Sequence, residues 1–329
     1  MKSFLIIGGG SIGKRHVRNL LELGEKNICI VEVNPQRAEE VAREFSVKTF
    51  SSLDEAFATE KFDCVFVCSP TIYHLEQVKK CVEYGADIFI EKPVSHNLEG
   101  VEGLQKIIQE KKLITLVGSN WKFYPLFQKM KEILESGRLG KVLSARCEFG
   151  QYLPDWHPWE DYRKGYSANK KLGGGVLLDS HEFDYMTWFL GKVDRVACIA
   201  NKVSDLEIDV EDVAEVALQF ESGAVGGIHL DYLQRTYRRN FEFFCEHGTM
   251  EWDIHDKKVK IHEKGKHSEE IVLEEDYDVN QMYIEQTKHF LDCLEKRKET
   301  ITPFAKGVDV LKLICAAKDS SDQSKIITV

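Results

Sequence analysis

The sequence predicts an α/β protein of two domains, the first built on a parallel sheet and the second on a large, mainly antiparallel open sheet. The chain has 329 residues, more than the ~250–300 at which a single hydrophobic core stops growing. The first 120 residues alternate short, continuously apolar runs with stretches of helical periodicity. Beyond residue 210, apolar and polar residues instead alternate at every second position.

The parallel sheet is predicted from apolar runs at 4–7, 28–31, 64–68, 88–90 and 114–117. Continuous runs are expected of strands that are covered on both faces. Between them lie helical patterns at 12–23, 37–45, 53–59 and 73–84. Strands that alternate with helices of this length indicate crossover connections, which join parallel strands.

The antiparallel sheet is predicted from alternating stretches at 214–220, 228–232 and 241–245, the first two separated by the turn Glu221-Ser222-Gly223. A period of two with one polar face is typical of strands that are buried on one side. Amphipathic stretches at 123–134, 282–297 and 306–320 predict helices of the second domain. We therefore divide the chain into domains at 1–119 and 120–329.

Composition excludes several classes of protein. A net charge of −10 disfavours a nucleic-acid partner, and no apolar run approaches the ~20 residues of a membrane span. The apolar run at the N-terminus is too short for a signal-peptide core. None of the nine cysteines forms a Cys-x-x-Cys pair, and several lie in apolar runs, as reduced buried thiols do. We expect a cytoplasmic protein without membrane or nucleic-acid partners.

The segment Gly8-Gly9-Gly10-Ser11-Ile12-Gly13 fits the pattern G-x-G-x-x-G between the first strand and the first helix. In that context the helix N-terminus can hold a pyrophosphate, although a glycine turn can also serve packing alone. Glu32, 19 residues beyond Gly13, ends the second strand, where an acid accepts hydrogen bonds from the adenosine ribose. Glu32 should repel a ribose phosphate, which favours NAD, while Arg37 keeps NADP possible. The predicted cofactor-binding residues here are Gly8, Gly10, Ser11, Ile12, Gly13 and Glu32.

Two further segments follow strands of the same sheet. Ser69, Pro70 and His74 come after the strand at 64–68, and Glu91-Lys92-Pro93 comes after the strand at 88–90. Ligands of open α/β sheets bind at the carboxyl ends of the strands. A lone Glu-Lys-Pro is usually a surface turn, but its distance from the glycine loop favours a binding role. We expect Ser69, Pro70, His74, Glu91 and Lys92 to contact the cofactor.

With Gly85 before the fourth strand, these motifs resemble the glucose–fructose oxidoreductase / inositol dehydrogenase / rhizopine-catabolism (Gfo/Idh/MocA) family of NAD(P)-dependent oxidoreductases. The resemblance covers essentially the whole chain, through segments at 117–120, 173–184, 248–252 and 303–307. It implies a Rossmann domain followed by an α+β domain. It also implies that helices pack on one face of the second sheet and that a homodimer or homotetramer forms through the opposite face.

The resemblance assigns catalysis to Lys92, beside the nicotinamide, with a Lys92–Pro93 bond that is often cis in the family. It assigns the catalytic base to His181, and a histidine side chain, with an ordinary pKa of ~6.5, suits proton transfer near neutrality. The family's catalytic aspartate lies four residues before the histidine, whereas Asp179 lies two before His181. Two residues apart within a helix lie on nearly opposite faces. Either the helix begins after Asp179, or only His181 faces the nicotinamide.

The segment at 151–163 contains two prolines and many aromatic and charged residues, which predicts a loop. Aromatic faces and paired polar groups bind sugars, and an arginine can hold a carboxylate or phosphate at two points. The loop resembles a branch of the family that is associated with surface-glycan or acidic-sugar pathways. The predicted substrate-binding residues are Asn120, Trp156, His157 and Arg163. The alternative is a packed loop or a subunit contact.

We therefore expect an enzyme that transfers a hydride between NAD and a secondary alcohol of a sugar-like, acidic or nucleotide-linked compound. The alternatives are an NAD-binding regulator or scaffold without turnover, and a dehydrogenase of amino-acid or imine compounds. No metal is expected. Acids and histidines at 155, 157, 179, 181 and 182 match no known ligand spacing.

Overall fold

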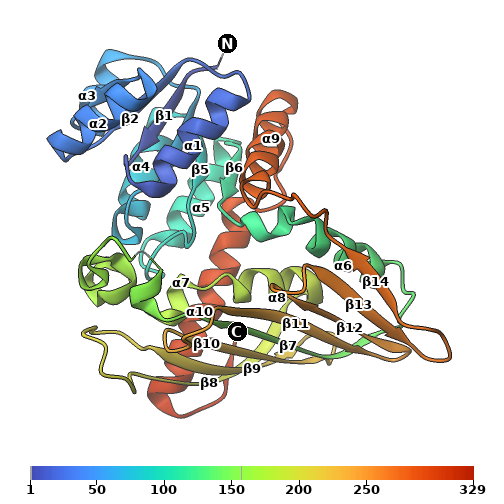
Figure 1. Ribbon diagram of the computed structural model, residues 1–329. Helices are drawn as coiled ribbons and strands as arrows, with labels where there is room; N and C mark the ends of the chain where they lie inside the picture. Colours follow the sequence, from blue (N-terminus) through green and yellow to red (C-terminus); the bar gives the residue numbers. More distant parts are fainter. Residues whose placement is uncertain (1, 157) are drawn as a thin grey trace. The chain divides into compact units, whose positions relative to one another are not determined.

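The computed structural model describes residues 2–156 and 158–329. The chain forms two compact units (Figure 1). The first extends to Asn120 and also takes in Val279–Val308, and the second consists of Trp121–Asp278 and Asp309–Val329. The predicted fold class is confirmed, because one sheet is parallel and the other is mainly antiparallel.

The first unit is built on six parallel strands in the order β3-β2-β1-β4-β5-β6. The strands are β1 Phe4–Ile7, β2 Ile28–Val31, β3 Lys48–Phe50, β4 Cys64–Val67, β5 Asp87–Ile90 and β6 Thr115–Val117. The helices between them are α1 Ser11–Glu22, α2 Pro35–Phe45, α3 Leu53–Thr59, α4 His74–Tyr84 and α5 Val101–Glu110. This is the Rossmann order, with its switch point between β1 and β4.

β3 is absent from the strands predicted above. This strand has three residues, lies at the edge of the sheet and begins with the exposed Lys48. The central strands β1, β2 and β4 are buried at every position. An edge strand does not need such a continuous apolar run, so the pattern that reveals the central strands is missing from β3.

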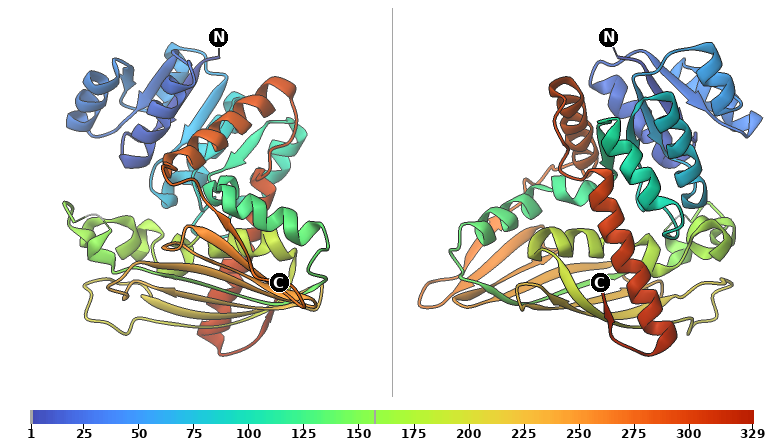
Figure 2. Two further views of the ribbon diagram at one scale, coloured as in Figure 1. Left: turned by 45° about the vertical axis from the view of Figure 1, so that its right-hand side comes forward. Right: turned by 180° about the vertical axis from the view of Figure 1, so that it is seen from behind.

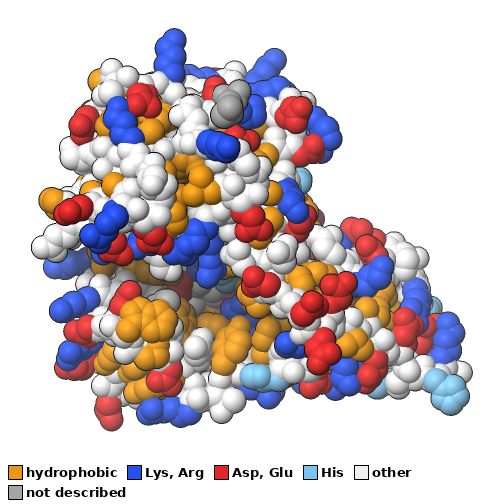
Figure 3. All heavy atoms as spheres, turned by 45° about the horizontal axis from the view of Figure 1, so that its top comes forward, with side chains coloured by type: hydrophobic (Ala, Val, Ile, Leu, Met, Phe, Trp, Pro, Cys, Tyr) orange, Lys and Arg blue, Asp and Glu red, His pale blue; other side chains and the backbone are white. Residues whose placement is uncertain are grey.

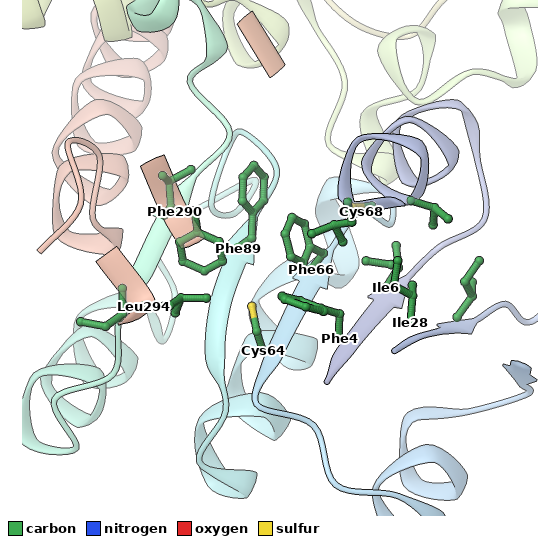
Figure 4. Close-up of a cluster of buried hydrophobic side chains, with 14 of the residues drawn as sticks. Phe4, Ile6, Ile28, Cys64, Phe66, Cys68, Phe89, Phe290 and Leu294 are labelled. Carbon is green, nitrogen blue, oxygen red and sulfur yellow. The ribbon is translucent and has the colours of Figure 1, made fainter. Parts of the chain in front are cut away.

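The core of the first unit includes a helix from the C-terminal part of the chain, α9 Asn280–Lys296. Phe66 of β4 and Phe89 of β5 stack with their ring centroids 4.6 Å apart. Phe290 of α9 meets both rings edge-on, at 5.8 and 5.6 Å (Figure 4). The linear division at 119/120 placed this helix in the second domain. The structure instead places it in the first unit, because its apolar face completes that core.

The chain after α9 also covers the edge of the first sheet. The backbone N–H of Val117 donates to the carbonyl of Thr302 over 2.8 Å. The hydroxyl of Thr300 donates to the carbonyl of Thr115 over 2.6 Å. β6 is the last strand of its sheet, so these bonds satisfy polar groups that an open edge would expose.

The second unit is built on nine strands in the order β14-β13-β12-β11-β7-β10-β9-β8-β15, in which only β7 and β10 pair in parallel. The strands are β7 Val142–Gly150, β8 Val193–Asn201, β9 Val213–Phe220, β10 Val225–Asp231, β11 Arg238–Cys245, β12 Gly248–Asp253, β13 Lys258–Glu263, β14 Glu269–Val272 and β15 Ile327–Thr328. Buried and more exposed residues alternate along β9, β11 and β13, as the period of two predicts.

Three helices lie on one face of this sheet, α6 Pro125–Glu135, α7 Val176–Asp179 and α8 Glu182–Leu190, as Figure 2 shows. The boundary between the units falls inside α10 Phe304–Gln323. In the described part of the segment predicted as an irregular loop, residues 151–156 and 158–163, the helical structure is limited to short 3-10 turns, at Leu153–Asp155 and Tyr162–Lys164. Irregular backbone between β7 and α7 therefore carries the aromatic and charged residues of that segment.

The described part of the chain contains no helix that is long and apolar enough to cross a membrane. All nine cysteines carry free thiols. Basic and acidic side chains lie interspersed on the face that Figure 3 shows, in keeping with 44 basic and 54 acidic residues in the sequence.

The contribution of α9 to the first core can be measured. Phe290→Ala should lower the free energy of unfolding by about 3–5 kcal/mol, because it removes a fully buried ring that packs against both Phe66 and Phe89. Glu295→Ala, at an exposed position of the same helix, should change it by less than about 0.5 kcal/mol. Urea unfolding measures both. Equal stability of the two variants would mean that α9 is not part of this core.

Candidate functional site

The glycine loop is shaped by two close approaches of the backbone. Gly8 has φ +101°, and a Cβ there would lie 2.9 Å from the carbonyl oxygen of Cys68. A Cβ at Gly13 would lie only 1.9 Å from the carbonyl oxygen of Gly8. A Cβ at Gly10, by contrast, would meet no heavy atom of the described residues within 4 Å. Gly8 and Gly13 are therefore required for close packing of the backbone, while Gly10 leaves open space over the loop.

The open space faces the start of a helix. α1 begins at Ser11, after Gly10 in extended conformation, and has no acidic residue in its first turn. The first N–H groups of a helix, here those of Ser11, Ile12 and Gly13, have no intrahelical acceptor and suit an anion. The loop is thus a cradle that fits the pyrophosphate of a dinucleotide.

Glu32 lies at the end of β2 beside this loop and is buried. Its carboxylate accepts hydrogen bonds from the N–H groups of Gly9 over 2.8 Å and Asn34 over 2.9 Å. The guanidinium of Arg37 lies 3.7 Å away. A carboxylate has about four lone-pair sites, so Glu32 keeps capacity for two ribose hydroxyls. It therefore both orders the loop and presents an acceptor next to it.

The predicted cofactor residues after β4 have internal partners. The hydroxyl of Ser69 donates to the side-chain oxygen of Gln77 over 2.6 Å. His74 is buried, with its ring nitrogens 2.8 Å from the carbonyl oxygen of Pro93 and 2.7 Å from that of Ser69. Burial lowers the pKa of His74. The side chain of His74 thus lies between the loop after β4 and the turn after β5 and faces a carbonyl oxygen of each. Pro70, the residue after Ser69, is exposed.

The turn after β5 contains Glu91, Lys92 and Pro93, and the Lys92–Pro93 peptide is cis, as the resemblance implies. The carboxylate of Glu91 accepts a hydrogen bond of 2.7 Å from Nε2 of His16, which is fully buried on α1. His16 is not among the predicted site residues. Its position three residues after Gly13, on the face that also buries Val17 and Leu20, is the signal that could have found it.

In the second unit, Asp179 and His181 do not share a helix. α7 ends at Asp179, Ser180 is extended, and α8 begins at Glu182 with His181 at its N-cap. The helix therefore begins after Asp179, which is the first of the two arrangements expected. Because the two residues do not lie within one helix, helix geometry does not place their side chains on opposite faces.

Asp179 is buried, and hydroxyl groups surround its carboxylate. It accepts hydrogen bonds from Ser167 over 2.7 Å, from Tyr232 over 3.4 Å and from Tyr166. These donors fix the carboxylate and connect the turn at 166–167 with α7 and with the residue that follows β10. The chemistry of such a group is that of an orienting acceptor.

The two acids that follow His181 are paired with cations that the sequence analysis did not single out. Glu182 is fully buried and forms an ion pair of 3.1 Å with Arg239. The guanidinium of Arg239 lies 4.6 Å from the ring centre of Trp121. Asp184 pairs with the buried Lys122 over 2.7 Å. Neither Lys122 nor Arg239 belongs to a local sequence motif. Their role as partners of Asp184 and Glu182 is evident only in the folded chain.

The predicted substrate-binding residues lie in different surroundings. Asn120 is buried at the end of the first unit's opening segment. Trp156 packs edge-on against Phe149 and Tyr232, at 5.8 and 5.3 Å. This contact favours the packed-loop alternative for Trp156.

Arg163 is half exposed and pairs with Asp161 over 2.7 Å and with Glu207 over 2.8 Å. These two acids already occupy the guanidinium N–H groups that could hold a carboxylate or phosphate at two points. His157 lies outside the described residues. Within the second unit, Trp156 thus lies among aromatic rings and Arg163 lies between two acids.

Among the described residues, no group of three or more histidine, cysteine, aspartate or glutamate side chains is arranged to hold a metal ion. Of the side chains considered for such a site, His157 lies outside the described residues. Asp179 and Glu182 are instead held by hydroxyl groups and by Arg239.

The cradle can be tested with two glycine variants. Gly10→Ala should unfold like the wild type, since its Cβ meets nothing, yet weaken dinucleotide binding by about tenfold or more where the pyrophosphate approaches the backbone. Gly13→Ala should lower the melting temperature, because its Cβ meets the carbonyl of Gly8. Thermal unfolding and fluorescence titration measure both effects. Unchanged binding to Gly10→Ala would place the pyrophosphate elsewhere.

Comparison with known proteins identifies both parts of the chain. Residues 2–119 match a family model described as an oxidoreductase family with an NAD-binding Rossmann fold. Residues 127–251 match the Gfo/Idh/MocA C-terminal domain.

The chain is 29% identical to a myo-inositol 2-dehydrogenase of Thermotoga maritima, over 98% of this chain and 97% of that one. It is 25% identical to a scyllo-inositol 2-dehydrogenase (NAD(+)) of Bacillus subtilis, over 92% and 88%. Its fold matches that of a levoglucosan dehydrogenase solved with NADH, with a TM-score of 0.90, 20% identity and coverage of 100% and 99%. The chain belongs to the Gfo/Idh/MocA family and is an NAD-dependent oxidoreductase.

Proposed function

We propose that this protein oxidises a secondary alcohol of a cyclic, sugar-like compound, and that Lys92, His181 and Asp179 carry the reaction. The observation that supports this most is the cradle at Gly10 beside Glu32, in the same unit as the Glu91-Lys92-Pro93 turn. Similarity along nearly the whole chain to a myo-inositol 2-dehydrogenase supports a cyclic polyol as the substrate class. When bound, NAD supplies the hydride acceptor.

The alcohol loses a hydride from carbon and a proton from oxygen, and gives a ketone, NADH and a proton. His181 takes the hydroxyl proton as the general base. The ammonium group of Lys92 stabilises the negative charge that develops on the oxygen. Asp179, fixed by its hydroxyl donors, orients the base His181. Ser11, Ile12 and Gly13 hold the pyrophosphate, and Glu32 holds the adenosine ribose.

The substrate class separates this proposal from its alternatives. An acidic or nucleotide-linked substrate held by Arg163 would have to displace Asp161 and Glu207 from the guanidinium. We therefore favour a neutral polyol. A screen of inositols, sugars, sugar acids, nucleotide-linked sugars and amino acids, read by nicotinamide absorbance, tests this. Turnover of amino acids alone would favour the amino-acid alternative, and binding of NAD without turnover would favour a regulator or scaffold.

We also propose that the chain forms a homodimer or homotetramer through the face of the second sheet that α6, α7 and α8 do not cover. The exposed side chains of Leu143, Ile199 and Val225 on β7, β8 and β10 support this. A hollow of about 620 Å³, lined by charged residues of β7 and β10 to β13, lies in the same sheet.

The cytoplasmic location stays a prediction.

The cofactor preference depends on Glu32. The wild type should bind NAD about tenfold or more tightly than NADP, because a ribose phosphate would meet the carboxylate of Glu32. Glu32→Ala should narrow this gap, since Arg37 is 3.7 Å away and remains to face the phosphate. Fluorescence titration of both cofactors measures it. Tighter binding of NADP by the wild type would contradict the prediction.

The catalytic assignments can be compared in single turnovers at saturating NAD. Lys92→Met and His181→Asn should each slow hydride transfer by about 100-fold or more, while NAD affinity stays near that of the wild type. Asp179→Asn should have a milder effect, because the amide keeps an oxygen for the surrounding hydroxyl donors. A larger loss in Asp179→Asn than in His181→Asn would move the role of base to the aspartate.

A further inference from the structure

Two buried histidines flank Lys92 in space, one from α1 and the other from α4. The carboxylate of Glu91, the residue before Lys92, lies 2.7 Å from Nε2 of His16. The carbonyl oxygen of Pro93, the residue after it, lies 2.8 Å from Nδ1 of His74. Both histidine side chains are at most 1% exposed. The backbone of the turn is therefore held from the interior on both sides of the lysine.

His16 is not the residue that packing alone would favour. Its ring lies among aromatic neighbours, 5.3 Å from the centre of Phe66 and 4.7 Å from that of Phe89. Its Nδ1 atom is buried and has no hydrogen-bond partner among the described residues. A buried polar atom without a partner destabilises a core, and a phenyl ring would avoid that loss. What the histidine adds is one bond, from its Nε2–H to the carboxylate of Glu91, which as a carboxylate only accepts.

The carboxylate of Glu91 is held on its other side as well. A Cβ at Gly118 would lie 2.6 Å from Oε2 of Glu91, so the glycine makes room for the side chain. The N–H of Gly118 donates to the carbonyl of Ile90 over 2.8 Å. Glu91 is thus fixed between α1 and the residue that follows β6.

His74 fixes the other side of the turn. Its two ring nitrogens face carbonyl oxygens, that of Pro93 and, at 2.7 Å, that of Ser69. A carbonyl oxygen can only accept, so the ring donates to one of them when neutral and to both when protonated. When the ring is protonated, its two bonds connect the loop after β4 with the turn that carries Lys92, and when it is neutral it can still donate from Nδ1 to Pro93 in that turn.

We propose that His16 and His74 are positioning residues for Lys92, and that His16 does this by fixing Glu91 relative to the glycine loop. His16 is three residues from Gly13, about one turn further along α1, so the loop and the turn are joined through a single helix. The expected effect on kcat rests on the proposed function of Lys92. The expected effect on the order of the Glu91-Lys92-Pro93 turn does not depend on that function.

Three substitutions of His16 separate positioning from packing. Glutamine reaches the place of Nε2 with a donor, asparagine is too short to reach it, and phenylalanine fills the aromatic site without a donor. At saturating substrate and NAD, His16→Gln should keep kcat within about threefold of the wild type, while His16→Asn and His16→Phe should lower it by about tenfold or more. NAD affinity should change by less than about twofold in all three. A packing role predicts the opposite order, with phenylalanine best tolerated.

Asn19→Leu is the matched control. Asn19 is also buried on α1, one turn beyond His16. Its side-chain oxygen accepts a hydrogen bond of 2.9 Å from Asn280 of α9, whereas the partner of His16 is Glu91 in the turn. This variant should leave kcat within about twofold. At His74, asparagine can keep the bond from the Nδ1 position to Pro93 and phenylalanine cannot, so His74→Asn should be the more active of that pair.

Amide hydrogen exchange gives a readout that needs no substrate. In the full-length His16→Phe variant, a peptide spanning residues 88–97 should exchange faster than in the wild type, while α2 should exchange at the wild-type rate. Unchanged exchange at 88–97, or an equal loss of kcat in His16→Phe and His16→Gln, would overturn the proposal. Faster exchange with unchanged kcat would mean that His16 orders the turn but that Lys92 is not catalytic, which would overturn the proposed function.

Discussion

The first unit depends on the close approach of α1 to the loop before it. Only a hydrogen atom fits between Gly13 and the carbonyl oxygen of Gly8, and Gly8 in turn lies against the backbone at Cys68. These approaches set the start of α1 directly over the ends of β1 and β4. The cradle at Gly10, the loop contact of Glu32 and the reach of His16 to Glu91 all follow from this one placement.

The second unit shows a different constraint, the burial of charge. The segment at 179–184 carries three acids that are largely or fully buried, and a buried carboxylate destabilises a core unless it is paired or hydrogen-bonded. Each has partners: hydroxyl groups for Asp179, Arg239 for Glu182 and Lys122 for Asp184. These partners hold the backbone around His181 in one arrangement. A general base needs such a fixed backbone, because proton transfer depends on geometry before it depends on pKa.

Local patterns were enough to predict most of the elements. β1, β2 and α3 have the predicted bounds, because their apolar runs or capping residues are contiguous in sequence. The glycine loop and the acid at the end of β2 were predictable for the same reason. β3 was not, since a short edge strand needs no continuous apolar run. The break between Asp179 and the helix that follows could not be predicted, because an interruption of two residues, Ser180 and His181, leaves no signal in periodicity.

The sequence by itself determined the fold class and the dinucleotide cradle, since each depends on patterns within a short stretch of chain. The roles of Lys92, His181 and Asp179 came instead from the resemblance to a known family. Only the tertiary structure decided that α9 completes the first core, that His16 holds Glu91, and that Arg239 and Lys122 neutralise the acids beside His181. It also decided that Arg163 pairs with Glu207, 44 residues away. These contacts join residues that are far apart in sequence, and no local periodicity or motif specifies which distant groups will meet once the chain is packed.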